Sequence, residues 1–108
     1  MKTLHGTGAN HGKVTAKVNI VTEPGTLPQK IPGTILVVPY TTPLMTIALM
    51  SCVGIISEQG GITSHASIVA REFGLPCIVG VANATKELKP GQIITMNGEK
   101  GVVSYEEK

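Results

Sequence analysis

The residue types best suited to chemistry gather at residues 60–71, whose sequence is GGITSHASIVAR. An apolar run just before them predicts a buried strand, and the two glycines predict a loop. Thr63 or Ser64 can serve as the N-cap of a helix that the Gly-Leu-Pro run at residues 74–76 ends. His65 is therefore expected in the first turn of a helix that follows a strand and a glycine loop.

This placement favours phosphoryl transfer through His65. The first N–H groups of a helix have no partner inside it, and the peptide dipoles make that end partly positive. Gly60 and Gly61 allow the backbone to approach an anion closely, although they also fit an ordinary turn. A neutral imidazole is a nucleophile, and the N–H groups would stabilise a phosphoryl group bound to it. Thr63 and Ser64 are expected to donate hydrogen bonds to phosphoryl oxygens or to orient the ring, and one of them caps the helix.

Helical periodicity places His65 outside the core. Ala66, Val69, Ala70 and Phe73 lie at positions i, i+3, i+4 and i+7 and form one apolar stripe. At about 100° per residue, His65 falls at the edge of this stripe and towards solvent. The alternative of a satisfied core histidine is therefore disfavoured.

Two further residues of the same helix are candidates for contacts with a partner. Ile68 is apolar but lies away from the stripe, beside the histidine face, and we expect it to belong to a docking patch. Arg71 lies about 120° from His65 around the helix, so direct contact with the phosphoryl group is not expected. A structural or docking ion pair is the predicted role of Arg71.

The longer segment GGITSHASIVAREFGLPCIVG, at residues 60–80, resembles a known signature. It is similar to the phosphohistidine motif of the mobile, swivelling domain of phosphoenolpyruvate-utilising enzymes, which include pyruvate phosphate dikinase, phosphoenolpyruvate synthase and enzyme I of the sugar phosphotransferase system. Residues 35–40 and 98–103 also resemble this family, so the resemblance spans most of the chain. Thr63 matches a position that some members phosphorylate for regulation.

The resemblance implies a fold, a reaction and partners. It implies an α/β domain with three layers, β/β/α, and a phosphohistidine at His65. It further implies that the domain swings between an ATP-binding and a phosphoenolpyruvate-binding domain or subunit. No cofactor is expected in this domain itself, and magnesium is expected in the partner domains.

Size and composition bound these expectations. A chain of 108 residues is the size of a single domain, here 1–108, and a hydrophobic content of 42% supports one core. A net charge of +2 with 3% aromatic residues gives no nucleic-acid footprint. No apolar run approaches the length needed to span a bilayer, and the N-terminus lacks the apolar block of a signal peptide, so a cytoplasmic protein is expected.

Other catalytic classes find little support. Cys52 and Cys77 have no metal-ligand spacing with each other or with a histidine, so free buried thiols are expected and no metal site. The chain contains no Asp, which excludes a Ser-His-Asp triad. A cysteine-based or metal-based enzyme is therefore the weakest hypothesis.

The elements around the motif alternate between strand and helix. Strands are predicted at residues 13–22, 34–38, 53–57, 77–81, 92–96 and 102–105, the last two as a hairpin. A helix is predicted from Pro43, with Thr42 as N-cap, to about Met50, and a helical turn at 82–88. Residues 6–13 match neither a Walker nor a dinucleotide pattern and are expected to form a turn, and residues 23–33 a loop. The pattern fits helices packed on a mixed sheet with a second β layer.

The length also limits the function. A (β/α)₈ barrel alone needs about 250 residues, so this chain is not a self-contained dikinase or synthase. It is expected to be a phosphotransferase component, either a stand-alone module or a piece of a larger enzyme, and the Met start and charged end favour the former. The alternative is a non-catalytic docking or regulatory domain of the same fold.

Overall fold

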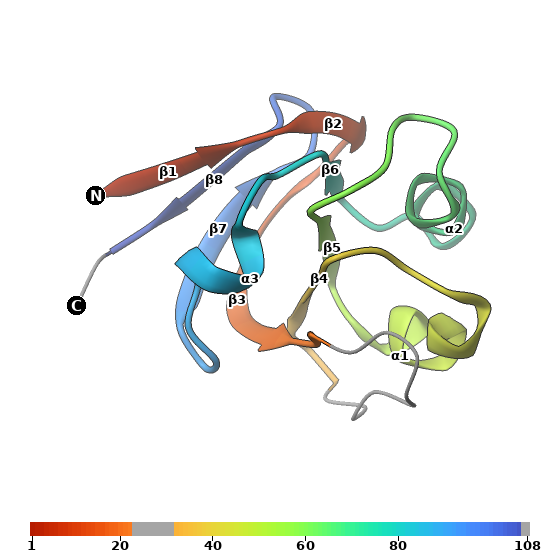
Figure 1. The fold of residues 1–108 in the computed structure, drawn as a ribbon, viewed down its shortest axis with the longest axis horizontal. Coiled ribbons are helices and arrows are strands. Elements are labelled where there is room, and N and C mark those ends of the chain that lie inside the picture. Colours follow the sequence, from red (N-terminus) through yellow and green to blue (C-terminus); the bar gives the residue numbers. More distant parts are fainter. Residues whose placement is uncertain (23–31, 107–108) are drawn as a thin grey trace.

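Two β-sheets share one long strand at the centre of the computed structural model, which describes residues 1–22 and 32–106 (Figure 1). The strand order is β1-β8-β7-β3-β4-β5-β6-β2. The first sheet is antiparallel and contains β1 (Lys2–His5), β8 (Val102–Tyr105), β7 (Ile93–Asn97) and β3 (Lys13–Ile20). The second contains β3, β4 (Ile35–Val38), β5 (Gly54–Ser57) and β6 (Cys77–Val79), all parallel, with β2 (Thr7–Asn10) antiparallel at its edge.

Gly6 links the two ends of this strand order, because it joins β1 to β2. Its N–H donates to the carbonyl of Gly101 at 2.9 Å. A Cβ on Gly6 would lie 2.5 Å from the carbonyl oxygen of Val79, so a side chain does not fit there. The chain therefore turns from one sheet to the other at a residue that must be small, and the two sheets enclose a common interior.

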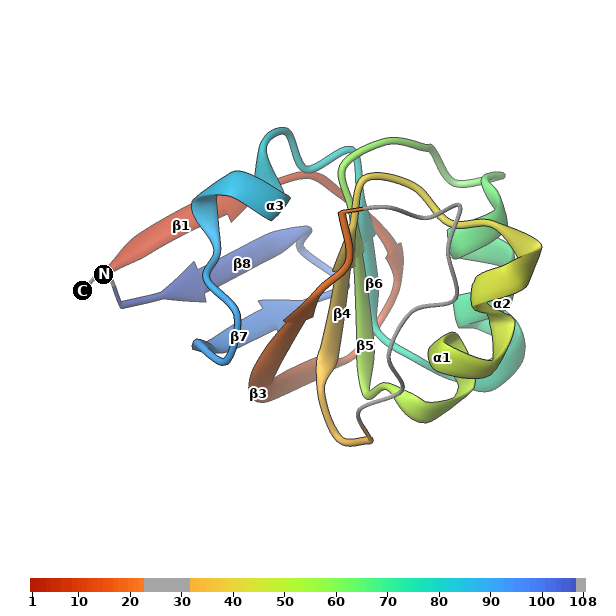
Figure 2. The ribbon, with the colours of Figure 1, turned by 60° about the horizontal axis from the view of Figure 1, so that its bottom comes forward.

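Helices cover the outer face of the second sheet (Figure 2). A 3₁₀ turn, η1 (Pro43–Met45), leads into α1 (Thr46–Ser51), and α2 (His65–Phe73) packs beside it over β6, β5 and β2. The short α3 (Ala84–Glu87) contacts β4 and contributes to the core between the two sheets. The three layers are thus β, β and α, as the family resemblance implied.

Strand β4 is buried on both faces and separates two apolar clusters. Ile35 and Val37 face the cluster between the sheets, whereas Leu36 and Val38 face the cluster under the helices. All four side chains are fully or almost fully buried. The strand predicted at residues 34–38 is confirmed, and its continuous apolar run is typical of a strand that is covered on both faces. The parallel strands β4 and β5 thereby become a rigid base for the loops that follow them.

Most predicted elements are present with slightly shorter bounds, but the turn predicted at residues 6–13 is wrong. Residues 7–10 form β2, which pairs with β6 through a register shift between Gly8 and Asn10. Gly8 is small because β2 crosses the β7–β8 hairpin: a Cβ there would lie 2.2 Å from the carbonyl oxygen of Gly98. The glycines that suggested a turn instead allow close packing of strands. Only Gly12, with φ +123°, has the backbone of a turn.

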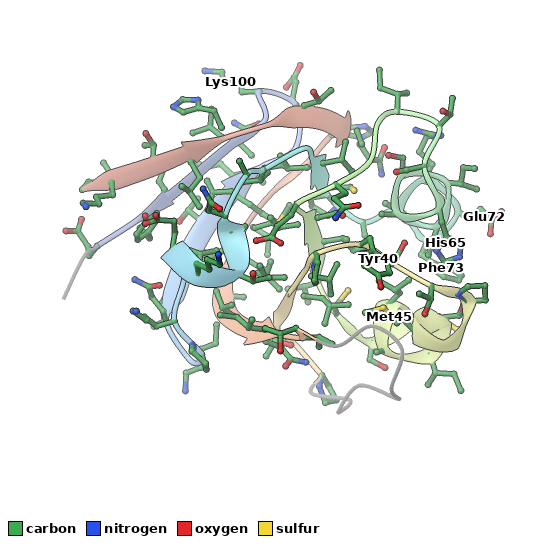
Figure 3. All side chains as sticks on the ribbon, viewed as in Figure 1. Tyr40, Met45, His65, Glu72, Phe73 and Lys100 are labelled. Carbon is green, nitrogen blue, oxygen red and sulfur yellow. The ribbon has the colours of Figure 1, made fainter. Side chains whose placement is uncertain are left out.

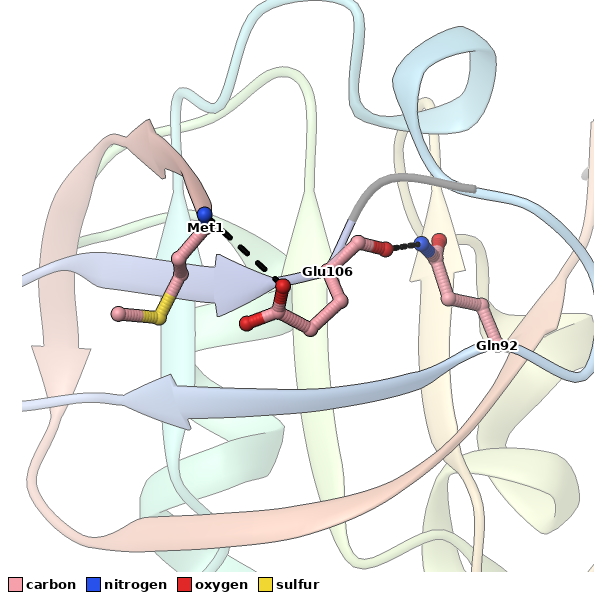
Figure 4. Close-up of polar contacts among 3 residues, drawn as sticks. All are labelled: Met1, Gln92 and Glu106. Carbon is pink, nitrogen blue, oxygen red and sulfur yellow. Dashed lines mark hydrogen bonds and ion pairs between the residues drawn. The ribbon is translucent and has the colours of Figure 1, made fainter.

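The first and last described residues lie near each other at one edge of the first sheet (Figure 4). The N-terminal ammonium of Met1 lies 3.9 Å from the carboxylate of Glu106, and the side-chain amide of Gln92 donates to the Glu106 carbonyl at 2.9 Å. The ion pair is exposed and contributes little to stability.

The loop expected at 23–33 falls mostly outside the described residues. Among the helices that are described, none has the length and apolarity to cross a membrane.

Candidate functional site

Helix α2 begins and ends as the sequence predicts. Ser64 is its N-cap, and its Oγ accepts a hydrogen bond from the N–H of Ser67 at 3.5 Å. The helix ends at Gly74, whose φ of +67° is the left-handed conformation that glycine favours. His65 is the first helical residue, half-buried, at the end where N–H groups are free to bind an anion. Figure 3 shows its ring on the side of α2 that faces the segment of Tyr40.

The loop before α2 needs one of its two glycines for steric reasons. Gly60 has φ +107°, and a Cβ on it would lie 2.9 Å from both Cβ and Oγ of Ser64. A Cβ on Gly61 would meet no atom within 4 Å. The carbonyl of Gly61 instead accepts two hydrogen bonds, from the N–H of Ser64 at 3.0 Å and from Oγ of Ser67 at 2.6 Å. The loop is thus fixed against the first turn of the helix.

Ser67 was not predicted to have a role, yet it is fully buried.

Phe73, predicted as a core residue, is 40% exposed. Phe73 is the last residue of α2, so its ring lies at the end of the helix, while Ala66, Val69 and Ala70 cover the sheet as predicted. The apolar stripe is therefore correct for two turns and wrong at the third.

A hydroxyl group from another part of the chain orients the His65 ring. Oγ1 of Thr41 lies 2.8 Å from Nδ1 of His65. When Nδ1 carries the proton and donates it to Thr41, the lone pair of the ring is at Nε2. Sequence reasoning assigned no chemical role to Thr41, which stands just before the predicted N-cap Thr42. Its position directly after a buried parallel strand was the signal available, since such strand ends meet at one edge of the sheet.

Main-chain hydrogen bonds hold the Thr41 segment beside the histidine loop. The N–H of Glu58 donates to the carbonyl of Val38 and that of Gln59 to the carbonyl of Pro39, each at 2.9 Å. These bonds continue the pairing of β4 with β5 beyond the ends of the strands. The distance between Thr41 and His65 is therefore set by the sheet itself.

A third loop is attached to the same place through Glu58. One carboxylate oxygen of Glu58 accepts from the N–H of Thr85 at 2.8 Å and from its Oγ1 at 2.7 Å. Thr85 lies in the first turn of α3, so Glu58 acts as a cap for that helix from outside it. The loop after β5 is therefore hydrogen-bonded to the segment after β4 on one side and to α3 on the other.

These loops surround a hollow with a volume of about 170 Å³ beside the imidazole. Its lining residues are Tyr40, Thr41, Ser57, Gln59, Gly60, Ser64, His65 and Ala66. Of the predicted site residues, the structure brings His65, Ser64 and Gly60 to the hollow. Gly61 and Thr63 do not line the hollow. The carbonyl of Gly61 accepts hydrogen bonds from the first turn of α2, and Thr63 is exposed in the same loop.

Arg71 and Ile68 lie elsewhere on α2. The guanidinium of Arg71 donates to the carbonyl of Ile62 at 2.9 Å and to that of Ala9 at 3.3 Å. These hydrogen bonds to the main chain connect α2 to β2 and to the loop, and an ion pair of Arg71 with a docked partner stays a prediction. Ile68 is 45% exposed, so its apolar side chain is at the surface as predicted.

The two cysteines are free and buried in the cluster under the helices. Burial raises the pKa of the Cys52 thiol to about 11 and that of Cys77 to about 12. Thiols held in the neutral form are poor nucleophiles and poor ligands. Within residues 1–22 and 32–106, no three His, Cys, Asp or Glu side chains gather in a way that could hold a metal ion.

A comparison with known protein families finds a match that includes the histidine loop and α2. Residues 30–101 match the family described as "PEP-utilising enzyme, mobile domain". The chain belongs to this family. The match includes both Thr41 and His65, so the two residues that meet in the structure both lie within the mobile domain.

Relatives of this mobile domain are much longer proteins. This chain is 44% identical over 100 residues to a probable phosphoenolpyruvate synthase of Methanothermobacter thermautotrophicus. The aligned region covers 93% of this chain and 15% of that protein. The chain is 40% identical to the phosphoenolpyruvate synthase of Pyrococcus furiosus, over 93% of this chain and 12% of that one. The chain thus spans about one seventh or less of the relatives it matches.

Solved structures support the fold. An Enzyme I protein aligns with 71% of this mobile domain and 32% of its own chain, with a TM-score of 0.61 and 28% identity. Aconitase X of Thermococcus kodakaraensis aligns over 99% and 100% of the two chains with a TM-score of 0.76, but at 19% identity it shows a shared fold only. The three-layer fold is therefore wider than the phosphoenolpyruvate-utilising family, and function must be argued from the site.

Proposed function

We propose that this mobile domain carries a phosphoryl group on Nε2 of His65 between a nucleotide-binding and a phosphoenolpyruvate-binding partner. The observation that carries the proposal is the hydrogen bond of 2.8 Å between Nδ1 of His65 and Thr41, at the N-terminal end of α2. This bond leaves Nε2 as the nucleophilic nitrogen. The family supplies the context, because relatives of this domain are named phosphoenolpyruvate synthases.

In the proposed step the phosphoryl group moves from the donor to the His65 ring. The Nε2 lone pair attacks the phosphorus of the donor, an N–P bond forms, and the bond from phosphorus to the leaving oxygen of the donor breaks. That oxygen departs with the electron pair, and the proton on Nδ1 stays on the ring, held by Thr41. The ring then carries a positive charge, which makes the imidazole a good leaving group when an acceptor attacks the phosphorus.

The loop supplies stabilisation for the developing negative charge. The Gly60 backbone, the Ser64 hydroxyl and the first N–H groups of α2 lie beside the hollow, and Thr63 is in the same loop. Neutral donors that are fixed before the reaction stabilise a phosphoryl group without reorganisation. Thr63 is exposed, which suits the regulatory phosphorylation that the family resemblance implies. We place the activity in the cytoplasm, with magnesium bound by the partners.

The test is phosphoryl transfer to the purified protein, for the wild type and for His65→Ala. Phosphoenolpyruvate and ATP are offered separately, each with and without lysate of the source cells, and the intact mass is measured. The expected result is an acid-labile, alkali-stable label that requires His65 and lysate. A folded wild-type protein that acquires no label under any of these conditions would contradict the proposal and favour a docking or regulatory role.

A further inference from the structure

Two exposed polar side chains that line the His65 hollow have no protein hydrogen-bond partner within the part of the chain that the structure describes. They are the Tyr40 hydroxyl and the Gln59 side-chain amide. Both residues line the hollow of about 170 Å³ that contains the imidazole. They come from different loops, one after β4 and one after β5. Neither was among the residues expected to stabilise a phosphoryl group, which were Gly60, Gly61, Thr63 and Ser64.

The backbones of these two residues are fixed although their side-chain ends are free. Gln59 donates its N–H to the carbonyl of Pro39 at 2.9 Å, and its own carbonyl accepts from Oγ of Ser57 at 2.7 Å. Tyr40 stands between two residues that are held by hydrogen bonds. The carbonyl of Pro39 accepts from the N–H of Gln59, and Oγ1 of Thr41 bonds Nδ1 of His65. The pairing of β4 with β5 therefore fixes the backbone positions of Tyr40 and Gln59 relative to the His65 ring.

The size and chemistry of the hollow suit a phosphoryl group. A water molecule takes up about 30 Å³ in the liquid, so the hollow can take the three oxygens of a phosphoryl group with room for solvent. A phenol and a primary amide are both hydrogen-bond donors without charge. Uncharged donors bind a dianion less firmly than Arg or Lys would, which fits a group that must be passed on.

We propose that Tyr40 and Gln59 donate hydrogen bonds to the phosphoryl oxygens of phosphorylated His65. This inference rests on the proposed function and adds two stabilising residues to it. Donors to these oxygens withdraw charge from the phosphoryl group, so they slow the loose, dissociative loss of that group to water. The two side chains thereby lengthen the time for which the carrier keeps its cargo between partners.

The experiment measures the lifetime of the phosphohistidine without any partner. Potassium phosphoramidate, a small chemical donor, is used to phosphorylate the wild type, Tyr40→Phe and Gln59→Leu, and the reagent is then removed. Loss of label from each histidine is followed by peptide mass spectrometry and by ³¹P NMR. Tyr105→Phe is the matched control, since Tyr105 is the other tyrosine of the chain and is buried between the sheets.

The expected result is a half-life at His65 about tenfold shorter in each variant, the effect of losing one hydrogen bond to a charged group. The half-lives at the exposed His5 and His11 serve as internal references and stay the same. Tyr105→Phe removes a tyrosine hydroxyl that lies away from the hollow, so this control should keep the wild-type half-life at His65. Unchanged half-lives at His65 in both variants would overturn the inference, while leaving transfer from natural donors, and hence the proposed function, intact.

Discussion

The Thr41 hydroxyl and the His65 imidazole meet at 2.8 Å, although 24 positions separate them in the sequence. Thr41 follows β4 and His65 follows β5, and these two strands are parallel neighbours. The carboxyl ends of parallel strands lie at the same edge of a sheet, so the loops that follow them are brought together. This contact engages Nδ1 of the ring, and in the proposed carrier it leaves Nε2 as the nitrogen that reacts.

Replacement of this hydroxyl tests that selection. Thr41→Val keeps the shape of the side chain but removes the acceptor for the Nδ1 proton, a loss of about 1 kcal/mol or slightly more. We expect the initial rate of His65 phosphorylation by lysate and donor to fall about tenfold. Thr15→Val is the matched control, because the Thr15 hydroxyl bonds Thr95 on the far sheet at 2.8 Å. Equal rates for Thr41→Val and the wild type would contradict the assignment.

The two glycines of the loop should respond differently to alanine. Gly60→Ala forces a side chain into φ +107° and brings its Cβ to 2.9 Å from Ser64, whereas a Cβ at Gly61 meets nothing within 4 Å. We expect Gly60→Ala to lower the free energy of unfolding by about 1–3 kcal/mol and Gly61→Ala to change it by less than about 0.5 kcal/mol. Urea denaturation of the two variants provides the measurement. Equal losses would show that the φ angle and the contact with Ser64 do not constrain the loop.

The sequence is informative where a local rule determines the structure. A cap at Thr63 or Ser64, the Gly74 end of α2 and the burial of β4 on both faces follow from spacing and residue type, and the structure has the cap at Ser64 and the other two as expected. The surface position of Ile68 follows from helical periodicity in the same way.

What the sequence does not reveal depends on contacts between distant segments. The pairing of β2 with β6, the crossing at Gly8 and the bond from Thr41 to His65 all join residues far apart in the chain. Burial of Ser67 was missed because a serine in a helix is usually exposed, and here the Gly61 carbonyl satisfies it. For Thr41 and His65 the positions after two buried strands were a signal, whereas a single sequence carries none for the strand pairing or the crossing at Gly8.

The buried cysteines predict how stability depends on pH. The usual thiol pKa is 9.0, and burial raises that of Cys52 to about 11 and that of Cys77 to about 12. Between these values the unfolded chain releases protons that the folded chain keeps, so stability falls as the pH rises above about 9. Each thiol contributes a slope of at most about 1.4 kcal/mol per pH unit.

Urea denaturation at pH 8, 9 and 10 measures this slope. The variant Cys52→Ala/Cys77→Ala should be less stable at pH 8, because it loses buried volume, but its stability should decline less between pH 9 and pH 10. The lysines and tyrosines remain in both proteins, so their titration cancels in the comparison. An identical decline in the two proteins would mean that the thiols are not protected by burial.

The exposed apolar side chain beside the histidine face predicts where partners dock. Ile68 is 45% exposed on α2, and Ile93 is 60% exposed on the other sheet, which makes Ile93 the matched control. A lysine at an apolar contact with a partner costs desolvation, so Ile68→Lys should slow transfer with lysate about tenfold, and Ile93→Lys should not. Neither change removes buried volume, so the urea midpoints should stay close to that of the wild type. Phosphorylation by phosphoramidate, which needs no partner, should be the same in all three proteins. If Ile68→Lys transfers at the wild-type rate, the partner does not contact this part of α2.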